Sequence, residues 1–281
     1  MTSVNEYPFS QVDVFAPGPQ PGNPVAVVHN ADDLSAEQMQ SFANWTNLPE
    51  TTFLLRPTRP EADYRLRIFT PASELPFAGH PTLGSAHAWL ENGGQPHRPG
   101  ELVQECEVGL VKISQTANEQ FFEAPPLRRS GPLEPEVLEQ AITSLRITPE
   151  EVLDSNWVDN GPGWLGIRLA SARAVLDLTP DFTAMGQLNV GVIGAYGDGG
   201  PADFEVRGFL PGLAIPEDPV TGSLNAGLAQ WLIGSGAAEG NYTVSQGTAL
   251  GRGGRLTITS EGDSIWVGGT SRTVVRGSAF L

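Results

Sequence analysis

The sequence has very little cysteine and histidine. Cys106 is the only cysteine among 281 residues, so no disulfide can form within the chain and a thiol-pair mechanism is excluded. The four histidines are scattered, with no His-x-x-x-His pair and no Cys/His cluster, so a metal site has no support. The Gly-rich stretch 247–254 lacks the Gly-Lys-Ser/Thr of a phosphate loop. We therefore expect a protein that needs no metal or organic cofactor.

Positive charge and long apolar runs are also scarce. The chain has 16 Lys and Arg against 32 Asp and Glu, a net charge of −16. Such a surface repels phosphate backbones and anionic membranes, which argues against nucleic-acid or membrane partners. No stretch approaches the ~20 apolar residues of a membrane span, and the first ten residues lack an apolar signal core. We expect a soluble cytoplasmic protein.

The two halves of the sequence repeat one another. A Phe-x-Pro motif at 69–71 recurs at 209–211, an offset of 140 residues, and Trp-Leu at 89–90 recurs at 231–232, an offset of 142. Each offset is half the chain length, so the sequence predicts a duplicated unit. The helices predicted after Pro81 and Thr221 would place two N-termini opposite one another. Their free N–H groups suit an anion such as a carboxylate.

Each half combines several strands with one apolar, small-residue helix. Regular strand–helix alternation is absent, which predicts an α+β fold rather than a doubly wound one. The Pro-rich stretch 124–132 is the predicted linker, giving lobes of residues 1–124 and 125–267. Strands are expected at 7–15, 25–28, 51–55, 64–69, 101–114, 119–123, 163–170, 190–196, 203–209, 242–245, 255–259, 264–267 and 273–280, and further helices at 35–46 and 134–145.

Two carboxyl groups are candidates for proton transfer. Glu50 lies at the mouth of a predicted strand among small or apolar residues, where a carboxyl group can serve as a general acid/base. From its position alone, an exposed loop glutamate is the alternative. Asp218 lies just before the second small-residue helix, and a helix-capping aspartate is the alternative there.

Two further polar residues lie at the helix starts. His80 precedes Pro81, and a capping or core histidine is the alternative interpretation. Ser223 lies in the first turn of the second helix, where it could hold a ligand carboxylate or be a satisfied helix-start serine. Ser223, His80 and Asp218 also make a conceivable hydrolase triad. However, residues 221–225 are no Gly-x-Ser-x-Gly elbow, so this alternative is weak.

Long, specific motifs are spread over nearly the whole chain. They occupy the segments 13–15, 22–28, 47–53, 67–71, 74–84 and 217–223, with shorter motifs at 245–247 and 251–252. These segments resemble the PhzF family of phenazine-biosynthesis-like isomerases.

This resemblance implies a fold like that of diaminopimelate epimerase. Such a fold has two pseudo-symmetric α+β lobes, each a curled mixed sheet or barrel around a central helix, with the active site in the cleft. The last strand, 268–281, is then expected to return to the first lobe. Family members are often dimers, so a homodimer is expected.

The resemblance also implies the chemistry. The characterised phenazine enzyme isomerises a dihydro-hydroxyanthranilate by shuttling a proton without a cofactor. By motif, Glu50 is the acid/base, with His80 and Asp218 as its catalytic partners. Substrate binding falls to the amides of Gly79 and Gly222 and to Ser223 and Asn23. The epimerase relatives use two cysteines, which this chain lacks in both motifs.

Three departures from the family pattern leave the substrate open. Leu224-Asn225 follows Ser223 where many relatives have Ala-His, 251–254 reads Gly-Arg-Gly-Gly, and Pro49 precedes Glu50. We predict an isomerase of a small, cyclic or amino/hydroxy carboxylic acid. The alternatives are a non-catalytic carboxylate-binding protein and a serine hydrolase that uses Ser223.

Overall fold

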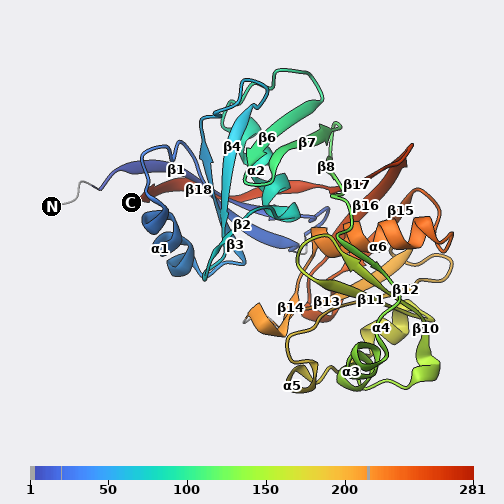
Figure 1. Ribbon diagram of the computed structural model, residues 1–281. Coiled ribbons are helices and arrows are strands. Elements are labelled where there is room, and N and C mark those ends of the chain that lie inside the picture. The colour runs from blue at the N-terminus through green and yellow to red at the C-terminus, as the bar shows by residue number, and fades with distance from the viewer. Residues whose placement is uncertain (1–3, 20, 214–215) are drawn as a thin grey trace. The chain divides into compact units, whose positions relative to one another are not determined.

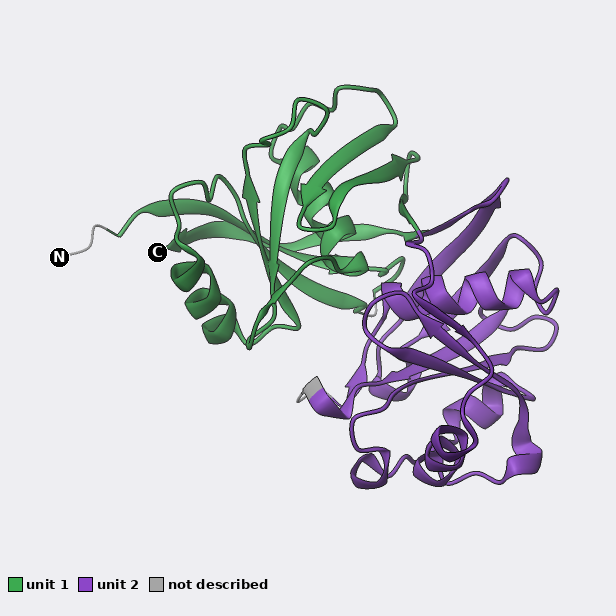
Figure 2. Cartoon of the chain, in the orientation of Figure 1, with its two compact units in different colours: residues 1–123, 268–281 green, residues 124–267 purple. Residues whose placement is uncertain are grey.

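The computed structural model describes residues 4–19, 21–213 and 216–281, and it divides into two compact units (Figure 2). Unit 1 comprises the described residues up to Glu123 together with Gly268–Leu281, and unit 2 comprises Ala124–Val267. Each unit is a mixed sheet with few helices, so the predicted α+β class is confirmed. Among the described residues, no helix has both the length and the apolar character needed to cross a bilayer.

In unit 1 the strands follow the order β18-β1-β2-β3-β4-β6-β7-β8, and β5 pairs with part of β4 (Figure 1). Pairing is parallel for β2–β3 and β4–β6 and antiparallel elsewhere. The elements are β1 (Glu6–Val14), β2 (Asn23–Val28), α1 (Ala36–Thr46), β3 (Glu50–Leu55), β4 (Tyr64–Phe69), β5 (Glu74–Leu75), α2 (Gly79–Glu91), β6 (Glu101–Cys106), β7 (Gly109–Gln115), β8 (Gln120–Glu123) and β18 (Ser271–Phe280).

In unit 2 the order is β9-β10-β11-β12-β13-β15-β16, and β14 pairs with part of β13. Pairing is parallel for β11–β12 and β13–β15. The elements are β9 (Arg129–Gly131), α3 (Pro135–Leu145), η1 (Pro149–Glu151), β10 (Val152–Asp159), β11 (Trp164–Leu169), α4 (Ala172–Leu176), α5 (Phe182–Met185), β12 (Asn189–Ala195), β13 (Phe204–Phe209), η2 (Pro211–Leu213), β14 (Glu217–Asp218), α6 (Gly222–Gly234), β15 (Tyr242–Gln246), η3 (Thr248–Leu250) and β16 (Gly254–Glu261). Strand β17 (Ser264–Gly269) begins in unit 2 and ends in unit 1.

The two units share one topology. The run β1-β2-β3-β4-β5-α2-β6-β7 has the same order and the same parallel and antiparallel pairings as β10-β11-β12-β13-β14-α6-β15-β16. In each unit an extra strand, β18 or β9, pairs antiparallel with the first strand of the run. The duplication predicted from the motif offsets is therefore present in the fold.

The central helices α2 and α6 are buried because small residues let them approach the strands closely. Gly84 and Gly227 are each the sixth residue of their helix. A Cβ on Gly84 would lie 2.4 Å from Val25 Cγ1, and one on Gly227 would lie 2.2 Å from the carbonyl oxygen of Val158. The matching glycines fix the depth at which each helix packs, and with it the position of each helix start.

Helix α1 begins as predicted. Ser35 is its N-cap, accepting from the Gln38 amide while the Gln38 side chain accepts from the Ser35 amide, a reciprocal capping box. The segment 101–114, predicted as one strand, is instead two strands, β6 and β7, joined by a turn. The predicted linker contains β9, which pairs with β10. The sequence pattern gave no indication of β10, in which polar and apolar residues do not alternate and only Trp157 and Val158 are buried.

Candidate functional site

Glu50, His80 and Asn23 come together in unit 1 because three elements begin at the same place. Glu50 is the first residue of β3, Asn23 the first of β2, and His80 the second of α2. Strands β2 and β3 are parallel, with Val25 opposite Glu50, so both enter the sheet from the same edge. Of the seven predicted site residues, these three form a cluster whose contacts the structure gives directly.

The contacts define which imidazole nitrogen carries the proton. Asn23 Nδ2 lies 3.3 Å from His80 Nδ1. The amide nitrogen can only donate, so Nδ1 accepts and the proton of neutral His80 resides on Nε2. That nitrogen lies 3.0 Å from Glu50 Oε2. The nitrogen that carries the proton thus lies beside the Glu50 carboxyl group.

The contact between His80 and Glu50 is buried. The side chains of His80 and Glu50 are 6% and 15% exposed. Glu50 Oε2 is buried, and its contact with His80 is not aligned as a hydrogen bond. Contacts of catalytic groups commonly tighten only when a substrate is bound. The exposed-loop alternative therefore does not describe Glu50, whereas the buried His80 fits the core-histidine alternative.

Gly79 is the first residue of α2, and the start of this helix has no side-chain cap. The N-cap residue is Ala78, whose side chain has no oxygen to accept from the first-turn amides. The first N–H groups of a helix have no partner within the helix and carry partial positive charge. The start of α2 beside Glu50 and His80 is therefore suited to an oxyanion.

The remaining site residues lie in unit 2, around the start of α6. Asp218 ends β14, Thr221 is the N-cap of α6, and Gly222 is its buried first residue. The capping alternative for Asp218 is wrong, because the cap position belongs to Thr221. Asp218 Oδ2 instead accepts a hydrogen bond from the Thr221 hydroxyl at 2.7 Å.

Ser223, in the first turn of α6, is held by two neighbouring side chains. Its Oγ accepts from Trp164 Nε1 at 3.1 Å, and its carbonyl oxygen accepts from Asn160 Nδ2 at 2.8 Å. All four histidines of the sequence belong to unit 1. Within unit 2, therefore, no imidazole is available to activate the Ser223 hydroxyl.

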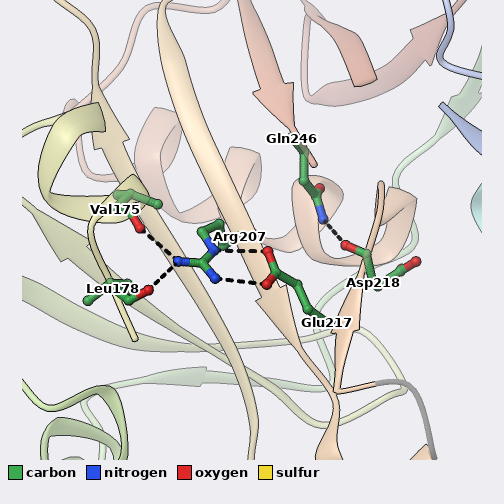
Figure 3. A network of polar contacts seen from close by, with 6 residues as sticks. All are labelled: Val175, Leu178, Arg207, Glu217, Asp218 and Gln246. Carbon is green, nitrogen blue, oxygen red and sulfur yellow. Dashed lines mark hydrogen bonds and ion pairs between the residues drawn. The ribbon is translucent and has the colours of Figure 1, made fainter. Parts of the chain in front are cut away.

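Sequence reasoning gave Gln246, the last residue of β15, no individual role; the structure shows that it ties the start of α6 together. Its fully buried amide makes four hydrogen bonds, two of them to Thr221 and one each to Asp218 and Asn225. Figure 3 shows the contact with Asp218. The only signal in the sequence was the Ser-Gln-Gly segment noted for its family resemblance.

A second unpredicted feature is an Arg–Glu fork present in both units. Arg207 donates to both carboxylate oxygens of Glu217 at 2.9 and 2.8 Å, and to the carbonyl oxygens of Val175 and Leu178 (Figure 3). Arg67 binds Glu74 in the same two-pronged way in unit 1. Each fork links the strand that carries the arginine to the short strand that precedes a central helix. The matching Arg-x-Phe segments were the available signal.

A cavity of about 210 Å³ in unit 1 is lined by none of the predicted site residues; Ser10, His29, Glu91 and Arg276 are among its walls. Burial, with a smaller effect from Arg276, lowers the pKa of His29 to about 4. The ring is therefore neutral at pH 7, and its Nε2 shares a hydrogen bond of 3.1 Å with the Ser10 hydroxyl. Within the described part of the chain, no three His, Cys, Asp or Glu side chains are grouped to hold a metal ion.

Comparison with solved structures places this fold among those of isomerases and epimerases. A hydroxyproline epimerase from Agrobacterium vitis covers 100% of this chain and 93% of its own at a TM-score of 0.58 and 13% identity, which shows the shared fold alone. A PhzF-family protein from Enterococcus faecalis matches more closely, with a TM-score of 0.82, 28% identity and coverage of 99% and 100%.

The sequence comparisons define the family. The family model described as phenazine biosynthesis-like protein matches residues 12–281, and the chain belongs to this PhzF family. Antisense-enhancing sequence 1 of Schizosaccharomyces pombe is 38% identical, with 99% of this chain and 100% of the relative covered. The trans-2,3-dihydro-3-hydroxyanthranilate isomerase of Pseudomonas chlororaphis is 34% identical, with 96% and 98% covered. The predicted membership of the PhzF isomerase family is confirmed.

Proposed function

We propose that this protein is a cofactor-independent isomerase of a small, cyclic or amino/hydroxy carboxylic acid, and that Glu50 shuttles the proton. The observation that carries the proposal is the buried contact between Glu50 and His80, with Asn23 fixing the imidazole tautomer. Family membership supports the reaction class, because the family includes relatives named as isomerases.

In the proposed reaction the Glu50 carboxylate takes a proton from a carbon next to a carbonyl group or double bond. The C–H electron pair moves into the conjugated system, and the protonated Glu50 then delivers the proton to another carbon of the same substrate. No oxidant or second substrate is needed. The His80 Nε2–H stabilises the Glu50 carboxylate before the proton is taken and after it is returned.

We propose that Asp218 assists this transfer. We further propose that Ser223 and the amides of Gly79 and Gly222 bind the substrate carboxylate and the negative charge that develops on it. Amides at a helix start bind anions well because their donors have no partner within the helix. Asn23 would act both through His80 and by lining the substrate site.

The test is turnover of trans-2,3-dihydro-3-hydroxyanthranilate and of a panel of cyclic amino and hydroxy acids. Glu50→Gln removes the base and keeps the size, and loss of a general acid/base typically lowers the rate about 10²–10⁴-fold. Glu101→Gln, the same change at a more exposed unit 1 glutamate paired with Arg98, is the matched control. A folded Glu50→Gln protein with wild-type turnover would refute the assignment.

The same panel separates the alternatives. Ligand binding without turnover by any substrate would favour a carboxylate-binding protein. Labelling of Ser223 by a fluorophosphonate would favour a serine hydrolase, although its Oγ already accepts from Trp164. The homodimer and the cytoplasmic location stay predictions, and light scattering after gel filtration tests the first.

A further inference from the structure

The amide of Gln246 has only one possible orientation. Its Oε1 lies 3.0 Å from the backbone nitrogen of Thr221, which can only donate, and 2.8 Å from Asn225 Nδ2. The amide nitrogen Nε2 therefore faces the other side. There it lies 3.2 Å from the carbonyl oxygen of Asp218 and 2.9 Å from Thr221 Oγ1. All the hydrogen-bonding capacity of the amide nitrogen is used within this one turn.

This orientation gives the neighbouring hydroxyl a direction. Thr221 Oγ1 accepts a hydrogen bond from Gln246 Nε2, so its own single proton is directed to Asp218 Oδ2, 2.7 Å away. The result is a one-way chain of donors from Gln246 through Thr221 to Asp218. A hydrogen bond to the charged form of an acid stabilises the carboxylate against protonation.

The strand before this turn is also held on its other face. Successive side chains of a strand point in opposite directions. Glu217 points to the buried Arg207, while Asp218 points away from it, as Figure 3 shows. Arg207 fixes one side of β14 and Gln246 fixes the carbonyl of Asp218, so the Asp218 side chain has little freedom to reorient.

We propose that Gln246 and Thr221 are positioning residues that orient Asp218 and keep it ionised for its part in the isomerisation. This inference rests on the proposed function only in that it assumes a role for Asp218 in turnover. The chain of hydrogen bonds itself is a property of unit 2. The competing view is that Gln246 merely fills a buried polar position, in which case its replacement would lower stability and leave the ionisation of Asp218 unchanged.

The experiment is a ¹³C-carboxyl NMR titration of Asp218 in the full chain. Thr221→Val keeps the shape of the side chain and removes its proton donor. We expect the Asp218 midpoint to rise by about one pH unit, the usual scale for loss of a single hydrogen bond to a carboxylate. Thr221→Ser retains the hydroxyl and should restore the wild-type midpoint. A Thr221→Val protein that titrates like the wild type would overturn the proposal.

Gln246→Glu tests the direction of the chain. The new carboxylate can accept a hydrogen bond from the Thr221 hydroxyl, which turns this donor away from Asp218, so the Asp218 midpoint should rise here as well. The matched control is Gln104→Glu. Gln104 is an equally buried glutamine of β6, and it contacts Tyr64 and Thr82 instead of a predicted site residue. An equal rise in this control would show a general effect of buried charge and would count against the proposal.

Turnover distinguishes this inference from the isomerase assignment. Where the wild type isomerises a substrate, the acid limb of its kcat/KM profile should move with the carboxyl midpoint in Thr221→Val. A limb that stays fixed while the midpoint moves would overturn the positioning role. Failure of the wild type to turn over any substrate would refute the isomerase proposal, and the titration would still decide whether the chain of hydrogen bonds exists.

Discussion

Replacing the arginine of each Arg–Glu fork by methionine is expected to destabilise the two units very unequally. We expect Arg207→Met to destabilise unit 2 more than Arg67→Met destabilises unit 1. Hydrogen-bond distance alone predicts the opposite, because Arg67 lies 2.7 Å from both Glu74 oxygens while the Arg207 contacts are slightly longer. Burial favours the second fork. The Arg207 and Glu217 side chains are 7% and 8% exposed, against 24% and 33% for Arg67 and Glu74.

The magnitudes follow from this difference in exposure. Arg207→Met leaves the Glu217 carboxylate buried without a counter-charge and removes the donor from two carbonyl oxygens. Breaking a buried pair from one side in this way typically costs about 3–5 kcal/mol. Arg67→Met breaks a half-exposed pair, for which about 0.2–1 kcal/mol is usual. The double change Arg207→Met with Glu217→Leu should recover the part of the lost stability that comes from the uncompensated charge of Glu217.

The assay is amide hydrogen exchange followed by mass spectrometry, with urea unfolding as a second measure. Exchange reports each unit separately, so faster exchange in β13 and β14 for Arg207→Met can be compared with that in β4 and β5 for Arg67→Met. Equal destabilisation by the two single changes would refute the argument from burial. A double variant that is no more stable than Arg207→Met would also refute it.

Two further predictions concern packing and pH. Gly227→Ala should lower the free energy of unfolding more than Gly84→Ala, because the new Cβ meets the Val158 carbonyl rather than a valine side chain; overpacking of this kind costs about 1–3 kcal/mol, measurable by urea unfolding. The lowered pKa of His29 should make the unfolding free energy fall as pH drops from about 6.5 to about 4. His29→Gln should flatten that fall by up to about 3 kcal/mol, and an unchanged pH dependence would contradict it.

The duplication, the central helices and most strands were predictable because their signals are local. Repeated motifs mark equivalent elements, and alternation in segments such as 64–69 marks half-buried strands. Strand β10 escaped prediction because its residues do not alternate between polar and apolar and are held in place by pairing with β9 and β11, which lie elsewhere in the chain. The single turns α4 and α5 are too short to produce a periodic pattern.

The site was predictable in its residue types and less so in its contacts. Position alone favoured an exposed loop for Glu50, and only the meeting of β3 with α2 shows its pairing with His80. Gln246 follows Asp218 by 28 residues. No local sequence pattern indicates that its side-chain amide makes hydrogen bonds to a turn so far away in the chain. Long-range hydrogen bonds of this kind depend on strand pairing, which a single sequence does not encode locally.

Strand β18 has a consequence for how the protein is made. It pairs along the whole of β1, and the amide and carbonyl of Leu281 exchange hydrogen bonds with those of Asn5. Unit 1 is therefore discontinuous, and its edge strand leaves the ribosome only after all of unit 2 has been synthesised. Unit 2 is contiguous and can fold first, reversing the usual N-to-C order. Until then β1 offers an unpaired edge, a template for wrong pairing with other chains. The nascent protein is most open to aggregation during this interval.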